Sequence, residues 1–188
     1  MMHFLRSAVL VLACAAMTLP AAANPTADMV AMSRAYASAK SWHADLHTSD
    51  GKTMKIDAVM PDKFHETIGP MEVIFLGTAG YVKQGSTWMK LPMEIPAMRR
   101  AISMANPSGN YDPSKQTDYT ISYVGAETVN GVAASHYRIT SKSGKQQPVD
   151  MWVGANHLPA RIIAQGDRGQ VTIDYSQWNA VPDITAPI

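Results

Sequence analysis

Apolar and polar side chains alternate along residues 41–60, in two runs separated by a turn. In the first run, Trp42 and Leu46 fall on the apolar parity. A period of two residues is typical of a β-strand that buries one face. The turn contains Asp50-Gly51, a dipeptide that favours a type I′ hairpin because both of its central residues need positive φ. The sequence therefore predicts a β-hairpin here, as the start of an antiparallel meander.

The same alternation recurs to the end of the chain, with turn residues between the runs. A second Asn-Gly hairpin signal stands at Asn130-Gly131. The two prolines of residues 182–187 predict an extended edge segment at the C-terminus. We expect about ten strands joined as successive hairpins. The eleven runs that alternate in this way are residues 41–48, 53–60, 64–68, 72–76, 81–84, 87–91, 119–123, 132–141, 149–153, 160–165 and 171–178.

Two segments depart from this pattern. Residues 26–40 repeat apolar side chains at helical spacing, with Thr26 as the expected N-cap. Residues 93–104 show the same spacing, with Pro96 near the start of the expected helix. A large antiparallel sheet must cover its apolar face, and two amphipathic helices favour covering by helices. The predicted fold is α+β and mainly β: a large curved antiparallel sheet with an N-terminal helix and a helical flap over one face.

The first residues have the features of a secretory signal. A positive N-terminus with Arg6 precedes an apolar run, and Ala21-Ala22-Ala23 offers a cleavage site. We expect residues 1–23 to be removed and residues 24–188 to form one domain in the periplasm. Cys14 follows a lipobox-like Val-Leu-Ala, so anchoring of the chain by a lipid at Cys14 is the alternative.

Charge limits the classes of partner. The chain is 16% charged, and without Arg6 its basic and acidic residues are equal in number. Such a chain lacks the basic surface of nucleic-acid-binding proteins and the polybasic patch that holds anionic membranes. We expect no nucleic-acid partner, while peripheral contact with a membrane stays possible.

The order of elements resembles the LolA/LolB-like superfamily of bacterial envelope proteins. The matching stretches include Met60-Pro61-Asp62-Lys63-Phe64, residues 81–92, residues 125–132, Met151-Trp152-Val153 and residues 158–162. The resemblance implies an open half-barrel whose hollow, covered by helices, binds acyl chains of a lipid or an acylated protein. The known carriers place a basic residue beside the cavity, whereas the first strand here carries His43, Asp45 and His47.

On this basis we expect a hydrophobic hollow and a lid. Glu66 shares the parity of the apolar residues in its strand, so it either points into the hollow or marks a bulge. The expected lid residues are Ile95, Met98 and Ile102. The expected lining residues of the hollow are Trp42, Leu46, Ile56, Phe64, Trp88 and Tyr123.

A metal site is a weaker alternative. His43, Asp45 and His47 share one face of a strand, and imidazole and carboxylate are ligands of zinc and copper. The simpler interpretation is the solvated face of that strand, and no cofactor is predicted. Methionines, abundant around residues 89–104, suit copper(I) but also adaptable apolar packing.

The sequence holds no nucleophile elbow and no identifiable Ser-His-acid set, so a hydrolase is disfavoured. Two functions are left beside the metal alternative. The first is a non-enzymatic periplasmic carrier of lipid or lipoprotein acyl chains. The second is an envelope sensor or regulator that uses the same fold to bind a partner protein.

Overall fold

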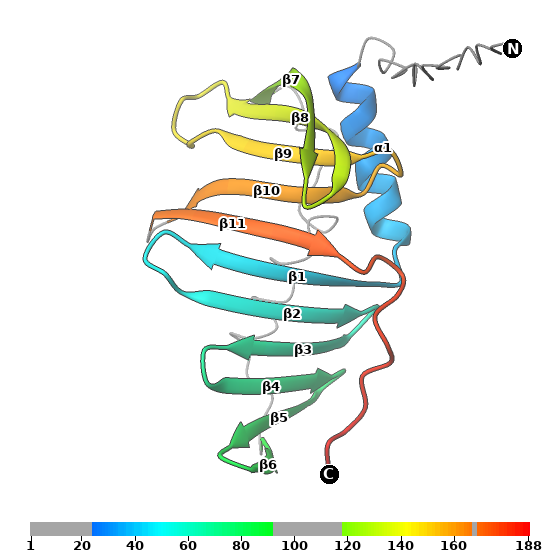
Figure 1. Ribbon diagram of the computed structural model, residues 1–188, viewed down its shortest axis with the longest axis vertical. Coiled ribbons are helices and arrows are strands. Elements are labelled where there is room, and N and C mark those ends of the chain that lie inside the picture. Colours follow the sequence, from blue (N-terminus) through cyan, green and yellow to red (C-terminus); the bar gives the residue numbers. More distant parts are fainter. Residues whose placement is uncertain (1–23, 92–117, 167–168) are drawn as a thin grey trace, which may run out of the picture.

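The computed structural model describes residues 24–91, 118–166 and 169–188. The expected signal peptide, the expected flap with Ile95, Met98 and Ile102, and Cys14 lie outside these residues. The described chain consists of one helix, α1, and eleven strands in one antiparallel sheet (Figure 1). No helix of this part has the length and apolar character needed to cross a bilayer.

Helix α1 (Pro25–Ser38) begins where the sequence favours a start. The side chain of Asn24 accepts a hydrogen bond from the backbone N–H of Ala27, and Pro25 occupies the first turn. Asn24 is therefore the N-cap in place of the expected Thr26. An Asn side chain bonds the free N–H groups of the first turn as well as a Thr hydroxyl does.

The strands follow one another around the sheet. The spatial order is β6-β5-β4-β3-β2-β1-β11-β10-β9-β8-β7, so β1 pairs with β11 and the ends of the order, β6 and β7, are edges. The sheet is thus open, as predicted for a half-barrel. The strands are β1 (Ser41–Thr48), β2 (Thr53–Val59), β3 (Lys63–Ile68), β4 (Met71–Leu76), β5 (Ala79–Gln84), β6 (Thr87–Lys90), β7 (Tyr119–Val129), β8 (Val132–Ser141), β9 (Val149–Gly154), β10 (Pro159–Gly166) and β11 (Gly169–Ser176).

The two hairpin signals have different outcomes. Asn130 and Gly131 both have positive φ, at 51° and 79°, as a type I′ turn requires. Between β1 and β2 only Gly51 has positive φ, at 81°, and the backbone of Thr48 bonds that of Lys52 around a longer loop. The hairpin is confirmed, but its turn is not type I′.

Helix α1 packs on one face of the sheet, which we call the inner face. Met29, Met32 and Tyr36 of α1 are buried in one cluster with Trp42 and Tyr175 from the centre of the sheet. This confirms that the apolar stripe of α1 covers the sheet. Figure 1 shows α1 crossing behind the ends of the strands near β8–β11. The face seen in front is the outer face.

The C-terminal segment does not add an edge strand. It runs along the ends of β1 to β4 in Figure 1, and Ile184 is buried with Ile74 and Tyr81. Lys63 and Asp183 form an ion pair of 2.5 Å that holds the segment to β3. The two prolines suit this extended path, but the segment is fixed by side-chain contacts in place of strand pairing.

Candidate functional site

The inner face carries a continuous transverse row of apolar and aromatic residues. Strand register places these residues directly opposite one another, so the row crosses nine strands from β7 to β4 without a polar interruption. We call it the inner row. Its members are Tyr123, Tyr137, Met151, Ile162, Ile173, Leu46, Met54, Ile68 and Met71.

Exposure is graded along the inner row. Tyr137 and Met151 are buried, whereas Leu46 and Ile173 are only partly buried. At the two ends of the row, Tyr123 is 38% exposed and Met71 is 42% exposed. The row therefore offers accessible apolar surface on both sides of its buried part.

A second row lies beside it, and it contains one charged residue. Glu66 stands between Ile56 and Val73 in unbroken register. It therefore points to the inner face, and the bulge considered from the sequence is absent at this position. Burial raises the pKa of the Glu66 carboxyl above its ordinary value. The row as a whole is Tyr175, Ala44, Ile56, Glu66, Val73, Val82 and Met89.

Helix α1 is fixed to this face by a polar bond inside an apolar contact. The Tyr137 hydroxyl donates to Asp28 Oδ2 of α1 over 2.7 Å. Burial, together with this bond to a carboxylate, raises the pKa of Tyr137 to about 12. Tyr36 completes the attachment, because it contacts the rings of Trp42, Tyr175 and Trp178 at centroid distances of 5.4 to 6.4 Å.

At the end of the strands away from α1, a pocket of about 570 Å³ opens between β7, β8, β9 and β10. Ile139 and Val149 contribute apolar surface, and both belong to the inner face by register with Ile121. Gln146 and Lys145 are among its polar lining residues, and Gln146 accepts a hydrogen bond from the Tyr119 hydroxyl over 3.0 Å. The pocket thus has both apolar and polar walls.

The expected lining residues divide between the two faces. Trp42, Ile56 and Phe64 are buried in the main cluster, and Leu46 packs against it. Tyr123 lies at the β7 end of the inner row. All five point to the inner face.

The prediction that Trp88 lines the hollow is wrong, because Trp88 lies on the outer face. It pairs with Lys83, whose ammonium lies 5.8 Å from the Trp88 ring centroid, and its ring lies 6.5 Å from that of His65. Lys83 in turn donates to Glu72 over 2.7 Å. Trp88 therefore cannot line the hollow.

The residues considered for a metal also lie on the outer face. His43 contacts Asp57 through Nδ1 at 2.6 Å and Asp45 through Nε2 at 3.2 Å, while His47 is exposed. In the described ranges, no group of three or more His, Cys, Asp or Glu side chains is arranged to hold a metal ion. Asp57 was not anticipated, although its position opposite His43 follows from the register of the first hairpin.

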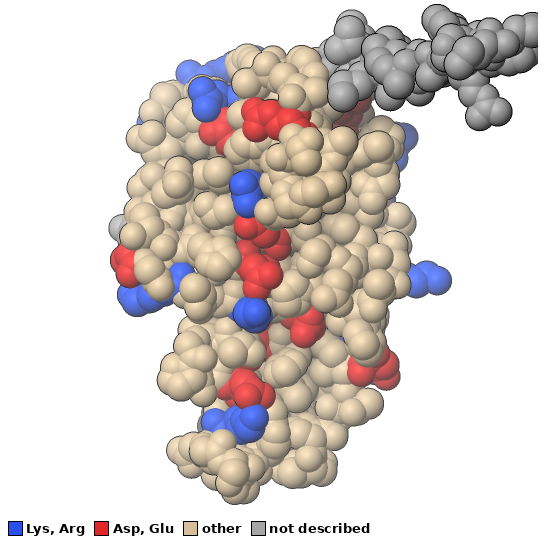
Figure 2. Space-filling model, viewed as in Figure 1, with Lys and Arg blue, Asp and Glu red and all other residues tan. Residues whose placement is uncertain are grey.

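Charged side chains form a stripe down the outer face (Figure 2). Arg161 bonds Asp174 at 2.6 and 3.0 Å, and Lys55 lies 3.7 Å from Asp45. Register places Arg161, Asp174, Asp45 and Lys55 in one row across β10, β11, β1 and β2, so two adjacent carboxylates are flanked by a base on each side. The outer face thus carries an ionic stripe beside two small apolar clusters, one around Ile74, Tyr81 and Ile184 and one around Val129, Ala134 and Trp152.

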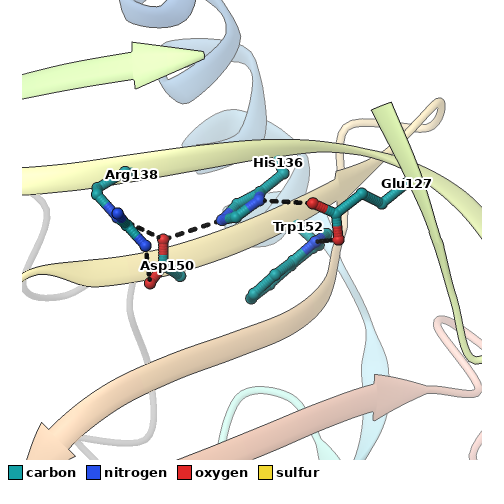
Figure 3. A network of polar contacts seen from close by, with 5 residues as sticks. All are labelled: Glu127, His136, Arg138, Asp150 and Trp152. Carbon is teal, nitrogen blue, oxygen red and sulfur yellow. Dashed lines mark hydrogen bonds and ion pairs between the residues drawn. The ribbon is translucent and has the colours of Figure 1, made fainter. Parts of the chain in front are cut away.

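The most connected part of the outer face surrounds His136 (Figure 3). Its two ring nitrogens contact Glu127 at 2.8 Å and Asp150 at 2.9 Å. Arg138 bonds both oxygens of Asp150, and the indole N–H of Trp152 donates to Glu127 over 2.9 Å. The bonds from Trp152 and His136 lower the pKa of Glu127. At Asp150, burial opposes ionisation, but the bonds from Arg138 and His136 outweigh it and lower the pKa.

Comparison with known proteins supports the fold. A model of a domain of unknown function, DUF4412, matches residues 86–169, less than half of the chain. No curated protein gave a sequence match. Lipoprotein LppX from Mycobacterium tuberculosis is similar over 87% of this chain and 100% of its own, with 14% identity and a TM-score of 0.63. LprF from Mycobacterium bovis is similar over 87% and 96%, with 13% identity and a TM-score of 0.65.

A chain of the MucA/MucB complex of Pseudomonas aeruginosa is also similar. The match covers 86% of this chain and 59% of that one, with 15% identity and a TM-score of 0.55. At these identities the likeness concerns the fold alone. The open, mainly β half-barrel expected from the resemblance to LolA/LolB-like proteins is confirmed.

Proposed function

We propose that this protein is a non-enzymatic periplasmic carrier that binds acyl chains of a lipid or of an acylated protein on the inner face. The observation that supports it is the inner row, which presents apolar side chains across nine strands and is only partly covered by α1. Each methylene of an acyl chain removed from water on such a surface contributes about 0.8 kcal/mol.

The segments of the chain have separate roles in such a carrier. Residues 1–23 act as the secretory signal, and residues 24–188 act as one unit in the periplasm. Residues 93–104, with Ile95, Met98 and Ile102, serve as the lid. The fold shared with lipoprotein LppX supports the envelope location.

The test is binding by the secreted protein. Native mass spectrometry of protein purified from a membrane-containing extract should find bound lipid, and added lipid should raise the melting temperature. Protein recovered empty, with no thermal shift on adding phospholipid or fatty acid, would rule the proposal out.

Substitutions at the exposed ends of the inner row make the test specific. Tyr123→Gln and Met71→Gln remove apolar surface from the inner face and should each weaken fatty-acid binding by about tenfold, corresponding to about 1.4 kcal/mol of lost contact. Val132→Gln is the matched control. Val132 is 43% exposed and pairs with Val129, which belongs to a buried cluster separate from that of the inner face. Its replacement should leave binding unchanged.

A second candidate is an interaction module that holds an envelope protein. The ionic stripe of the outer face supports it, because a row of acids and bases favours specific contact with a surface of complementary charge. The fold shared with a chain of the MucA/MucB complex also supports it. A module of this kind would retain its partner in pull-downs after lipid is stripped, and reversing the charges of Arg161 and Asp174 together would weaken that retention.

A further inference from the structure

Glu66 is the single charged residue among the strand residues that point to the inner face in the described part of the chain. Its cross-strand neighbours are Ile56 and Val73, and its same-face neighbours along β3 are Phe64 and Ile68. Four apolar side chains therefore surround one carboxyl.

This carboxyl is half-buried, and no ion pair or hydrogen bond is found for it within the described residues. Glu72 on the next strand shows the contrast. It points to the outer face, where the Lys83 ammonium bonds it at 2.7 Å and lowers its pKa. A carboxylate on an apolar surface without a cation loses hydration and receives nothing in return.

The missing partner can come from a ligand. An amphiphile whose head carries a positive charge would place that charge on Glu66 and lay its chain on the neighbouring apolar residues. Met54, Leu46 and Ile173, all partly buried, continue the surface from β2 to β11. With strands about 4.8 Å apart, the surface from β3 to β11 is about 14 Å wide.

We propose that the inner face binds long-chain amphiphiles with a cationic head, and that Glu66 is the counter-ion that selects them. This inference rests on the proposed acyl-binding function and names its ligand class. An anionic head at the same position would meet the Glu66 carboxylate and be repelled.

The experiment compares three ligands with the same dodecyl chain, each below its micellar concentration, by isothermal titration calorimetry at pH 8. They are dodecyltrimethylammonium, dodecanol and dodecanoate. The full secreted protein should bind the cation about tenfold more tightly than dodecanol, and dodecanoate most weakly. This ranking is measured on the unaltered protein and does not depend on whether a variant folds.

Two variants locate the selectivity. Glu66→Gln keeps the side-chain shape, and it should abolish the preference for the cation while leaving dodecanol affinity unchanged. Glu72→Gln neutralises a carboxylate on the adjacent strand but on the outer face, and it should change none of the three affinities.

The results separate this inference from the function on which it rests. If dodecanol and the cation bind equally, or if Glu66→Gln keeps the preference for the cation, the counter-ion role is overturned while acyl binding stands. If none of the three ligands binds, acyl binding itself fails and the selectivity fails with it.

Discussion

His136 stacks on Trp152 with ring centroids 4.1 Å apart and an interplanar angle of 17°, and both rings bond the same carboxylate, that of Glu127. The second ring nitrogen of His136 bonds Asp150. Both imidazole nitrogens therefore face carboxylate oxygens. This network joins β7, β8 and β9 on the outer face (Figure 3).

Replacing His136 by Phe should destabilise the protein by about 2 kcal/mol in urea unfolding. Phe keeps the stacking on Trp152 but removes the contacts of the ring nitrogens with Glu127 and Asp150, and it leaves Asp150 with Arg138 alone. His47→Phe, an identical change at an exposed position of β1, should alter stability by less than about 0.5 kcal/mol. Equal effects at the two positions would show that the contacts of His136 with Glu127 and Asp150 contribute no stability.

The stabilisation from this network should disappear in acid. The pKa values of Glu127 and Asp150 are lowered in the folded state, so the network contributes stability above the ordinary carboxyl pKa and loses it as pH falls through the folded values. The difference in unfolding free energy between the wild type and His136→Phe should be largest at pH 7. It should fall toward zero below about pH 4. A difference that is independent of pH would contradict ionised carboxylates as the cause.

The attachment of α1 depends on the bond between Tyr137 and Asp28. Tyr137→Phe should cost about 1 kcal/mol, because the Asp28 carboxylate loses its donor inside a packed contact. Hydrogen exchange should speed up in α1 more than in β2, since the bond joins the helix to the sheet. Tyr119→Phe removes a hydroxyl from an exposed residue that bonds Gln146, and it should leave exchange in α1 unchanged.

Much of the inner face could be predicted from sequence because strand parity is a local property. Trp42 and Leu46 share a parity in one run, Ile56 shares it in the next, and the structure places all three on one face. The parity of Glu66 likewise indicated the inner face, and the unbroken register of β3 decides between the two interpretations.

The prediction for Trp88 was wrong because it relied on the residue type and not on the strand register. Its aromatic character suggested the hollow, yet the short turn at Gly85-Ser86 pairs Gln84 with Thr87 and therefore Lys83 with Trp88. Once Lys83 is assigned to the solvated face, Trp88 must lie on the same face. The register of the hairpin contained that information.

The network of His136 could not be derived in this way. Glu127 and Asp150 are 9 and 14 residues from His136, and a break in register between Tyr123 and Gly125 changes which residues of β7 face β8. No periodicity in the sequence marks that bulge. The contacts thus depend on a detail of backbone pairing that is visible only in three dimensions.

Glu66 and Glu72 should respond to pH with opposite signs. Burial raises the pKa of Glu66 in the folded state, so its ionisation costs stability as pH rises above the ordinary carboxyl value. Glu66→Gln should therefore be more stable than the wild type at pH 8 but equal to it near pH 4. At Glu72, the bond from Lys83 lowers the pKa, so the carboxylate contributes stability at pH values above its ordinary pKa. Glu72→Gln should therefore be less stable than the wild type at pH 8 and equal to it in acid. Unfolding of the three proteins in urea across pH 4 to 8 measures both effects. A Glu66→Gln variant that loses stability at pH 8 would mean that the carboxylate already has a partner within the chain, and the reason to seek a cation in the ligand would be gone.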